Sequence, residues 1–76
     1  MASSLSVVTE LANRLHTARL HAGTSREAAA LAIDRSGMTI TAYERGRAVP
    51  PLRTLERLAR YYGVSVAELL REDDES

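Results

Sequence analysis

The 76-residue chain contains no cysteine, tryptophan, phenylalanine or lysine. Without cysteine it can form neither a disulfide scaffold, nor a cysteine-based zinc site, nor a thiol nucleophile, and this composition fits a reducing compartment. Because the only imidazoles are His16 and His21, a histidine-rich metal site is not expected either. With three tyrosines as the only aromatic residues, the core must be built from Leu, Ala, Val and Ile.

Long apolar runs and catalytic motifs are also missing. No stretch approaches the roughly 18 consecutive apolar residues of a membrane-spanning helix, and no signal-peptide pattern opens the chain. There is no glycine-rich phosphate loop and no pair of catalytic carboxylates. Ser25 and Ser36 are interpreted as helix caps. They are not expected to be nucleophiles, because neither has a plausibly placed His/Asp partner to activate its hydroxyl. We therefore expect a cytoplasmic protein that is not an enzyme, with no cofactor, metal, membrane partner or small-molecule effector.

The formal net charge is zero, but the charges are unevenly distributed. All ten positive charges are arginines, and four of the ten acidic residues lie in the last five positions, residues 72–76. Residues 1–71 therefore carry ten arginines against six acidic residues. This asymmetry predicts a basic single domain over residues 1–71, compatible with a nucleic-acid partner, followed by a solvated acidic tail over residues 72–76.

Apolar residues recur at helical spacing from residue 7 to the end of the predicted domain. The first helix ends at Gly23, and its apolar stripe comprises Leu11, Leu15, Ala18 and Ala22, extended backwards by Val7 and Val8. Residues 24–27 read Thr-Ser-Arg-Glu, a capping-box pattern that opens an alanine-rich helix over about residues 25–33. A third helix over residues 37–43 follows, with Ser36 as its N-cap and Ile40 and Tyr43 as its apolar positions.

The second half of the chain contains a loop and two further helices. Residues 46–51 are expected to be a loop, because a proline inside a helix removes a backbone hydrogen bond. The fourth helix begins near residue 51 or 52 and stops at Gly63, with an apolar face of Leu52, Leu55, Leu58, Ala59 and Tyr62. Ser65 and Glu68 form a second capping box before a final turn ending at Leu69 and Leu70. The sequence predicts an all-α fold of five helices without a sheet.

The second and third predicted helices have the spacing of a helix-turn-helix motif. Two short helices joined by a tight turn place the second helix in the DNA major groove. The helices must cross closely, and Ala29, Ala30 and Ala32 are small enough to allow this approach.

Four segments make the resemblance specific: GTSREAAALAI at 23–33, SGMTITAYERG at 36–46, PPLRTLERLAR at 50–60 and GVSVAELL at 63–70. From Leu11 to Leu70 the chain resembles the Cro/repressor-type helix-turn-helix family, the phage-repressor-like DNA-binding domains. The resemblance implies a compact five-helix domain that binds double-stranded DNA and regulates transcription. It further implies a small Cro-like repressor acting as a homodimer on an inverted-repeat operator.

The resemblance also assigns roles to individual residues. Arg26 corresponds to a phosphate contact at the start of the second helix, and Arg45 and Arg47 follow the recognition helix near the sugar–phosphate backbone. Arg19 and Glu44 resemble a partly buried ion pair that fixes the first helix against the third. The full set of candidate DNA-binding residues is Ser25, Arg26, Arg35, Ser36, Gly37, Met38, Thr39, Ala42, Arg45 and Arg47.

The base-reading positions depart from the family pattern. Bidentate contacts to base edges come from Arg, Lys, Asn or Gln, whereas Gly37, Met38 and Ala42 offer only backbone approach and apolar contact with thymine methyls. Thr39 adds one hydroxyl. Direct readout is therefore expected to be weak or shifted to the neighbouring arginines. In the turn, Asp34 replaces the usual glycine and tolerates the left-handed conformation better than most residues.

Other features leave alternatives open. His16 and His21 are expected to be solvated on different faces, and one of the adjacent residues Tyr61 and Tyr62 should face the core. Two surfaces could form the dimer: the start of the first helix or the last helix, comprising Leu5, Val7 and Val8, or Val66, Leu69 and Leu70. The weak recognition helix and the acidic tail also fit a competing role, an antitoxin-like or protein-interaction module on the same fold.

Overall fold

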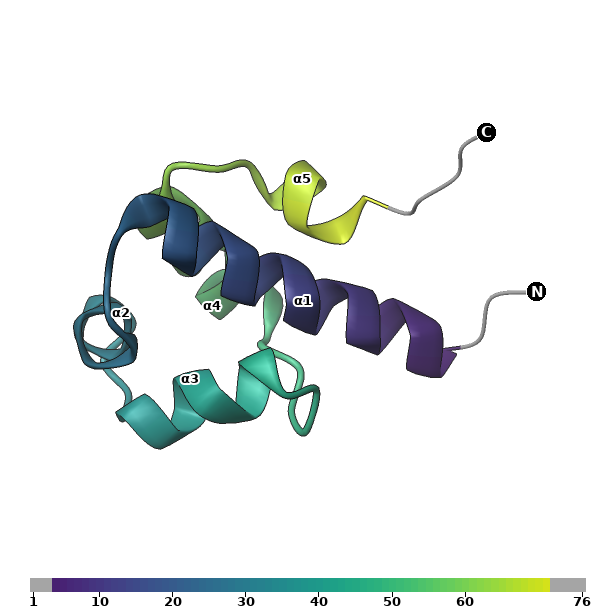
Figure 1. Ribbon diagram of the computed structural model, residues 1–76, viewed down its shortest axis with the longest axis horizontal. Coiled ribbons are helices and arrows are strands. Elements are labelled where there is room, and N and C mark those ends of the chain that lie inside the picture. Colours follow the sequence, from purple (N-terminus) through teal and green to yellow (C-terminus); the bar gives the residue numbers. More distant parts are fainter. Residues whose placement is uncertain (1–3, 72–76) are drawn as a thin grey trace.

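The computed structural model describes residues 4–71, within which the chain forms five α-helices and no strand (Figure 1). The predicted acidic tail, residues 72–76, lies outside this range. The all-α, five-helix prediction is confirmed. The helices are α1 Ser4–Ala22, α2 Arg26–Ala32, α3 Gly37–Glu44, α4 Leu52–Tyr62 and α5 Val66–Leu70.

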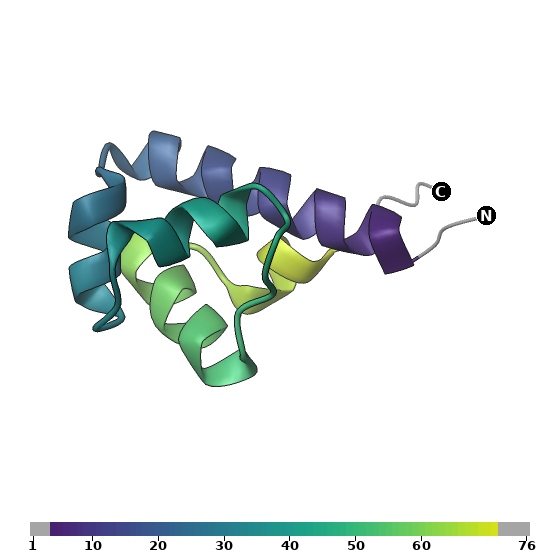
Figure 2. The same cartoon turned by 90° about the horizontal axis from the view of Figure 1, so that it is seen from below.

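The long helix α1 organises the arrangement of the other helices. It runs along the length of the molecule and packs against α3, α4 and α5, while α2 packs against α3 and α4 (Figures 1 and 2). The start of α1 and the end of α5 lie at one end of the molecule, and α2 lies at the opposite end (Figure 1). α3 is therefore held by α1 and α2 together.

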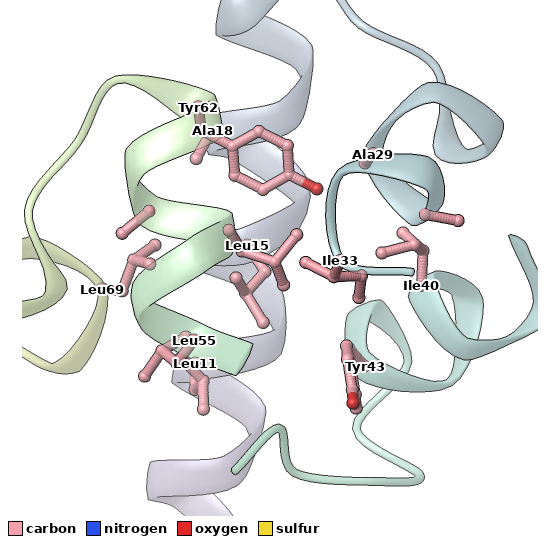
Figure 3. Close-up of a cluster of buried hydrophobic side chains, with 13 residues drawn as sticks. Leu11, Leu15, Ala18, Ala29, Ile33, Ile40, Tyr43, Leu55, Tyr62 and Leu69 are labelled. Atoms are coloured by element: carbon pink, nitrogen blue, oxygen red, sulfur yellow. The ribbon is translucent and has the colours of Figure 1, made fainter. Parts of the chain in front are cut away.

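The core is mainly aliphatic, as the shortage of aromatic residues predicted, but it also contains Tyr43 and Tyr62, each 7% exposed (Figure 3). Leu15, Ile40 and Leu58 are each only 1% exposed and bring α1, α3 and α4 together. Ala29 is fully buried on α2, and Ala30 is 2% exposed, so small side chains do allow a close approach of α2 to its neighbours. Truncating a fully buried aliphatic side chain of this kind typically costs about 2–5 kcal/mol.

Three positions of the predicted apolar faces are wrong, and all lie toward helix ends. Ala22 is the last residue of α1 and is exposed, while Leu52 is the first residue of α4 and is 62% exposed. Val7, in the first turns of α1, is 42% exposed. Periodicity places a residue on a face but does not say how far along the helix its packing partners extend. At these ends the apolar stripe continues past the packed part of the helix.

The helix caps follow the sequence only in part. The predicted Ser65–Glu68 box is present, with both reciprocal hydrogen bonds at 3.0 Å. The box predicted over residues 24–27 is wrong, because α2 begins at Arg26 and Glu27 is its second residue, one position short of the capping place. Ser25 caps α2 alone, its Oγ accepting from the backbone N–H of Ala28 at 3.0 Å. Ser36 is the N-cap of α3, as predicted, but its side chain makes no capping hydrogen bond.

The turn between α2 and α3 has the backbone conformation that the sequence predicted. Asp34 has a φ of +60°, the left-handed conformation that Asp accepts at lower cost than most residues. The backbone N–H of Arg35 then donates to the carbonyl of Ala30 at 2.9 Å, which closes the end of α2. This turn sets the direction in which α3 leaves α2.

Candidate nucleic-acid interface

The helix α3 has one face in the core and one face in solvent. Ile40 and Tyr43 are buried, whereas Met38 is 82% exposed. Thr41, Ala42 and Arg45 follow Met38 at helical spacing on the outer side, where none of them is buried. The outer face of α3 is therefore free to approach a partner.

Thr41 was not among the predicted site residues, although its position relative to Met38 could have identified it. Its hydroxyl donates to the Gly37 carbonyl at 3.2 Å, so its methyl group is the part left for an outside contact.

Several of the candidate arginines flank α3 at both of its ends. Arg35 precedes the helix, Arg45 and Arg47 follow it, and all three are exposed. The backbone N–H of Arg47 donates to the carbonyl of Ala42 at 2.9 Å, which fixes the path of the chain after α3. The outer face of α3 thus lies between positive charges.

Gly46 allows this path because its φ is +72°, a conformation that a side chain disfavours. A Cβ at this position would lie at ordinary contact distance, 3.7 Å from Val8 Cγ1 and 3.8 Å from Ala12 Cβ. The loop that carries Arg45 and Arg47 therefore rests directly on α1.

The predicted residues at the start of the motif differ in their accessibility. Ser25 and Ser36 are exposed, while Gly37 and Thr39 are half-buried. A Cβ added to Gly37 would lie 3.5 Å from Glu27 Oε2, so α2 already covers one side of this glycine. Gly37 can therefore contact an outside partner only through its backbone atoms, and only on the side that α2 leaves open.

Behind this surface, three side chains converge on the carboxylate of Glu44, whose side chain is 3% exposed. Arg19 Nε donates to Oε2 at 2.6 Å and its Nη2 to Oε1 at 3.3 Å. Oε1 also accepts from His16 Nδ1 at 2.9 Å and from Arg26 Nε at 3.2 Å. We call Glu44 with Arg19, His16 and Arg26 the Glu44 cluster. It ties α1, α2 and α3 together at one point.

The electrostatics of the cluster keep Glu44 ionised. Burial alone would raise the pKa of the Glu44 carboxyl, but the hydrogen bonds from Arg19 and His16 outweigh this effect and lower the pKa below its ordinary value. The hydrogen bond to Glu44 raises the pKa of Arg19 above its ordinary value. Arg19 also donates from Nη1 to the backbone carbonyl of Thr24 at 3.0 Å, in the link between α1 and α2.

The prediction that His16 is a solvated side chain is wrong. Its ring is 43% exposed, but Nδ1 donates to the buried carboxylate of Glu44. His16 stands one helical turn before Arg19 on α1, so helical spacing from the expected ion pair could have identified it. His21 is exposed, as expected.

Arg26, expected at a phosphate, also takes part in the Glu44 cluster. Its side chain is 38% exposed, and it is anchored to Glu44 through Nε. A guanidinium held through Nε keeps both terminal nitrogens available, and these present two parallel donors to an anion. The position of Arg26 on α2 is therefore compatible with a second, outer partner.

The lowered pKa of Glu44 predicts that the protein loses stability at acidic pH. A carboxyl whose pKa is lower in the folded state than in the unfolded chain stabilises the fold fully at a pH above its unfolded-state pKa. This contribution is lost as the pH falls through the folded-state pKa. We expect the contribution of Glu44 to be complete above its ordinary value of 4.5 and to disappear below it. Urea unfolding of the wild type and of Glu44→Gln from pH 7 to pH 3 measures this, because the difference between the two curves should shrink only at acidic pH. A constant difference would contradict the assignment.

Residues 4–71 offer neither a membrane span nor a metal site. No described helix is long and apolar enough to cross a membrane. Nor do these residues contain a group of three or more His, Cys, Asp or Glu side chains placed to hold a metal ion.

Comparison with known proteins identifies the family. Residues 10–71 match a family model described as a helix-turn-helix domain. The cryptic phage CTXphi transcriptional repressor RstR of Vibrio cholerae is 34% identical over 62 residues, which cover 82% of this chain and 56% of that protein. This chain therefore spans little more than half the length of that relative. The crystal structure of the hypothetical transcription factor NHTF from Neisseria has a TM-score of 0.80 at 25% identity, over 96% of this chain and 84% of that one. The chain belongs to the helix-turn-helix domain family, of the Cro/repressor type that its sequence resembles.

Proposed function

We propose that this protein binds double-stranded DNA at a specific sequence and represses transcription there as a homodimer. The observation that carries the proposal is the outer face of α3, with Met38 82% exposed and arginines at both ends of the helix. A helix presented in this way fits the major groove, and the flanking cations suit the phosphates on either side. The match to a phage transcriptional repressor supports the same function.

The mode of DNA recognition follows from the side chains on α3. Phosphate contacts from Arg26, Arg45 and Arg47 would position the domain without reading sequence. Met38 and Ala42 would contribute apolar contacts, for which a thymine methyl is the natural partner. We expect an operator with A·T pairs under the first turn of α3 and a modest energy per base contact.

Dimerisation is proposed through the end of the molecule where α1 starts and α5 finishes. The two candidate surfaces lie on helices that pack against each other, α1 and α5 (Figures 1 and 2). Val7 is 42% exposed and Leu70 is 47% exposed, whereas Leu69 is 3% exposed and belongs to the core, so its predicted role at a dimer surface is wrong. Val66 packs partly against the core, and the side chain of Leu5 lies outside the described residues.

The proposed function is tested by titrating labelled duplexes and following their fluorescence anisotropy at two salt concentrations. Selection from a random duplex pool supplies the sequence, and we expect an inverted repeat bound by two chains. Affinity should fall steeply with salt, because each phosphate contact releases a counterion. Weak and uniform binding to all duplexes would overturn the proposal and favour the protein-interaction role.

Two substitutions separate the positioning residues from the reading residues. Arg47→Ala should weaken binding to all duplexes about equally, by roughly 5–10-fold, because its partner is a phosphate. Met38→Ala should change the preference at a single base step and leave non-specific binding unchanged. Binding of each variant to a panel of operators with single base-pair changes measures both effects. If both variants lose affinity uniformly, the division between the two classes is wrong.

A further inference from the structure

A shallow groove lies between α2 and α4, apart from the proposed DNA surface. It has a volume of about 340 Å³ and is lined by Ala32, Arg57, Arg60 and Tyr61. α2 and α4 pack directly against each other at this place (Figures 1 and 2). None of the ten candidate DNA-binding residues lines the groove, so a partner bound here would leave the outer face of α3 free.

Tyr61 forms a wall that is fixed before any partner arrives. Its side chain is 42% exposed, and its hydroxyl shares a hydrogen bond of 2.9 Å with the hydroxyl of Thr24. Its ring packs against the buried Tyr62, with the two ring centroids 5.8 Å apart. A ring held at both ends loses little conformational freedom on binding. Leu31, next in sequence to the lining residue Ala32, is 82% exposed and adds apolar surface to the same part of α2.

The charges at the groove are positive, and no acidic side chain of the described part of the chain pairs with them. Arg57 and Arg60 are exposed on α4, and neither forms an ion pair within residues 4–71. Glu56 is exposed on the same helix but does not line the groove. Two free guanidinium groups beside a fixed aromatic wall complement a ligand that carries carboxylates next to an apolar side chain.

We propose that this groove docks an acidic segment of a partner protein. An apolar side chain of the segment lies against Tyr61 and Ala32, and its carboxylates bind Arg57 and Arg60. The acidic residues 72–76 of the same chain suit the groove less well, because α5 ends at the opposite end of the molecule from α2 (Figure 1).

The test uses the full chain and a synthetic peptide in which leucines alternate with pairs of Asp or Glu. Backbone NMR shifts on titration should concentrate on the four lining residues and Leu31. The double variant Arg57→Gln/Arg60→Gln should bind the peptide about tenfold more weakly. The matched control Arg53→Gln/Arg71→Gln removes the same charge from exposed positions outside the groove and should change affinity less than about twofold.

Three results would overturn the proposal. Shifts confined to α3 and Arg26 would place the peptide on the DNA surface. A loss of duplex affinity in Arg57→Gln/Arg60→Gln would make the groove a phosphate contact. If replacing the acidic residues 72–75 by Gln and Asn shifts the NMR signals of the groove residues without any peptide, the groove binds the acidic tail of the same chain. Because duplex binding is measured separately from peptide binding, failure of this proposal is distinguishable from failure of the proposed function.

Discussion

Replacing Glu44 by glutamine is expected to lower the free energy of unfolding by about 3–5 kcal/mol, the range for removing one partner of a buried ion pair. Glu44 is 3% exposed in its side chain, and its partner Arg19 is 8% exposed. The substitution leaves the guanidinium of Arg19 buried without a counter-ion. A domain of 76 residues has a total stability of roughly 4–11 kcal/mol. The variant should therefore lose a large share of its stability, and its Tm should fall by about 15–25 °C.

Urea unfolding followed by circular dichroism at pH 7 measures the effect of Glu44→Gln. Glu56→Gln is the matched control, because it makes the same change on an exposed residue of α4 and should shift stability by less than about 0.5 kcal/mol. The double variant Arg19→Met/Glu44→Leu removes both charges and should recover much of the loss, since replacing a buried pair by apolar side chains is often neutral. A loss below about 1 kcal/mol in Glu44→Gln would show that the cluster contributes little to the fold.

The sequence predicted the fold well because its signals are local. Helical spacing, prolines and the glycine stops each act within a few residues, so five helices could be placed with their ends within a few positions. Leu52, Ala22 and Val7 were assigned wrongly for a related reason: local spacing does not say where the packed part of a helix ends. The capping box predicted for α2 was wrong by a single residue, because the N-cap is Ser25 and not Thr24.

The candidate site was only partly predictable, because its contacts join distant parts of the chain. His16 and Glu44 are 28 residues apart, and Arg26 and Glu44 are 18 apart, so no local pattern connects either residue directly to Glu44. The one local signal was the position of His16 one helical turn before Arg19 on α1. The resemblance suggested the pairing of Arg19 with Glu44 but not the other two donors to this carboxylate. The groove between α2 and α4 is a still clearer case, since Ala32 and Tyr61 carry no motif that would bring them together.

The second large effect is expected in DNA binding, when Arg26 is replaced by glutamine. Arg26 holds Glu44 through Nε at 3.2 Å and keeps its two terminal nitrogens for a phosphate. A dimer loses this contact twice, so operator affinity should fall about 100-fold at low salt, and the slope of log K against log salt should decrease by about 1.8. Stability should change by less than about 1 kcal/mol, because a partly exposed ion pair contributes little and Arg19 still neutralises Glu44.

Arg26→Lys is the sharper variant, because it separates charge from geometry. A lysine carries the same charge on a single nitrogen. It therefore cannot bind Glu44 through one nitrogen and present two further, parallel nitrogen donors to a phosphate. We expect the salt slope to return to the wild-type value while affinity stays at least about tenfold weaker. Arg60→Gln, a charge loss at an exposed position of α4 away from the proposed DNA and dimer surfaces, should change operator affinity less than about twofold. Full recovery of affinity in Arg26→Lys would mean that Arg26 acts only as a point charge, and that its anchoring by Glu44 has no part in DNA binding.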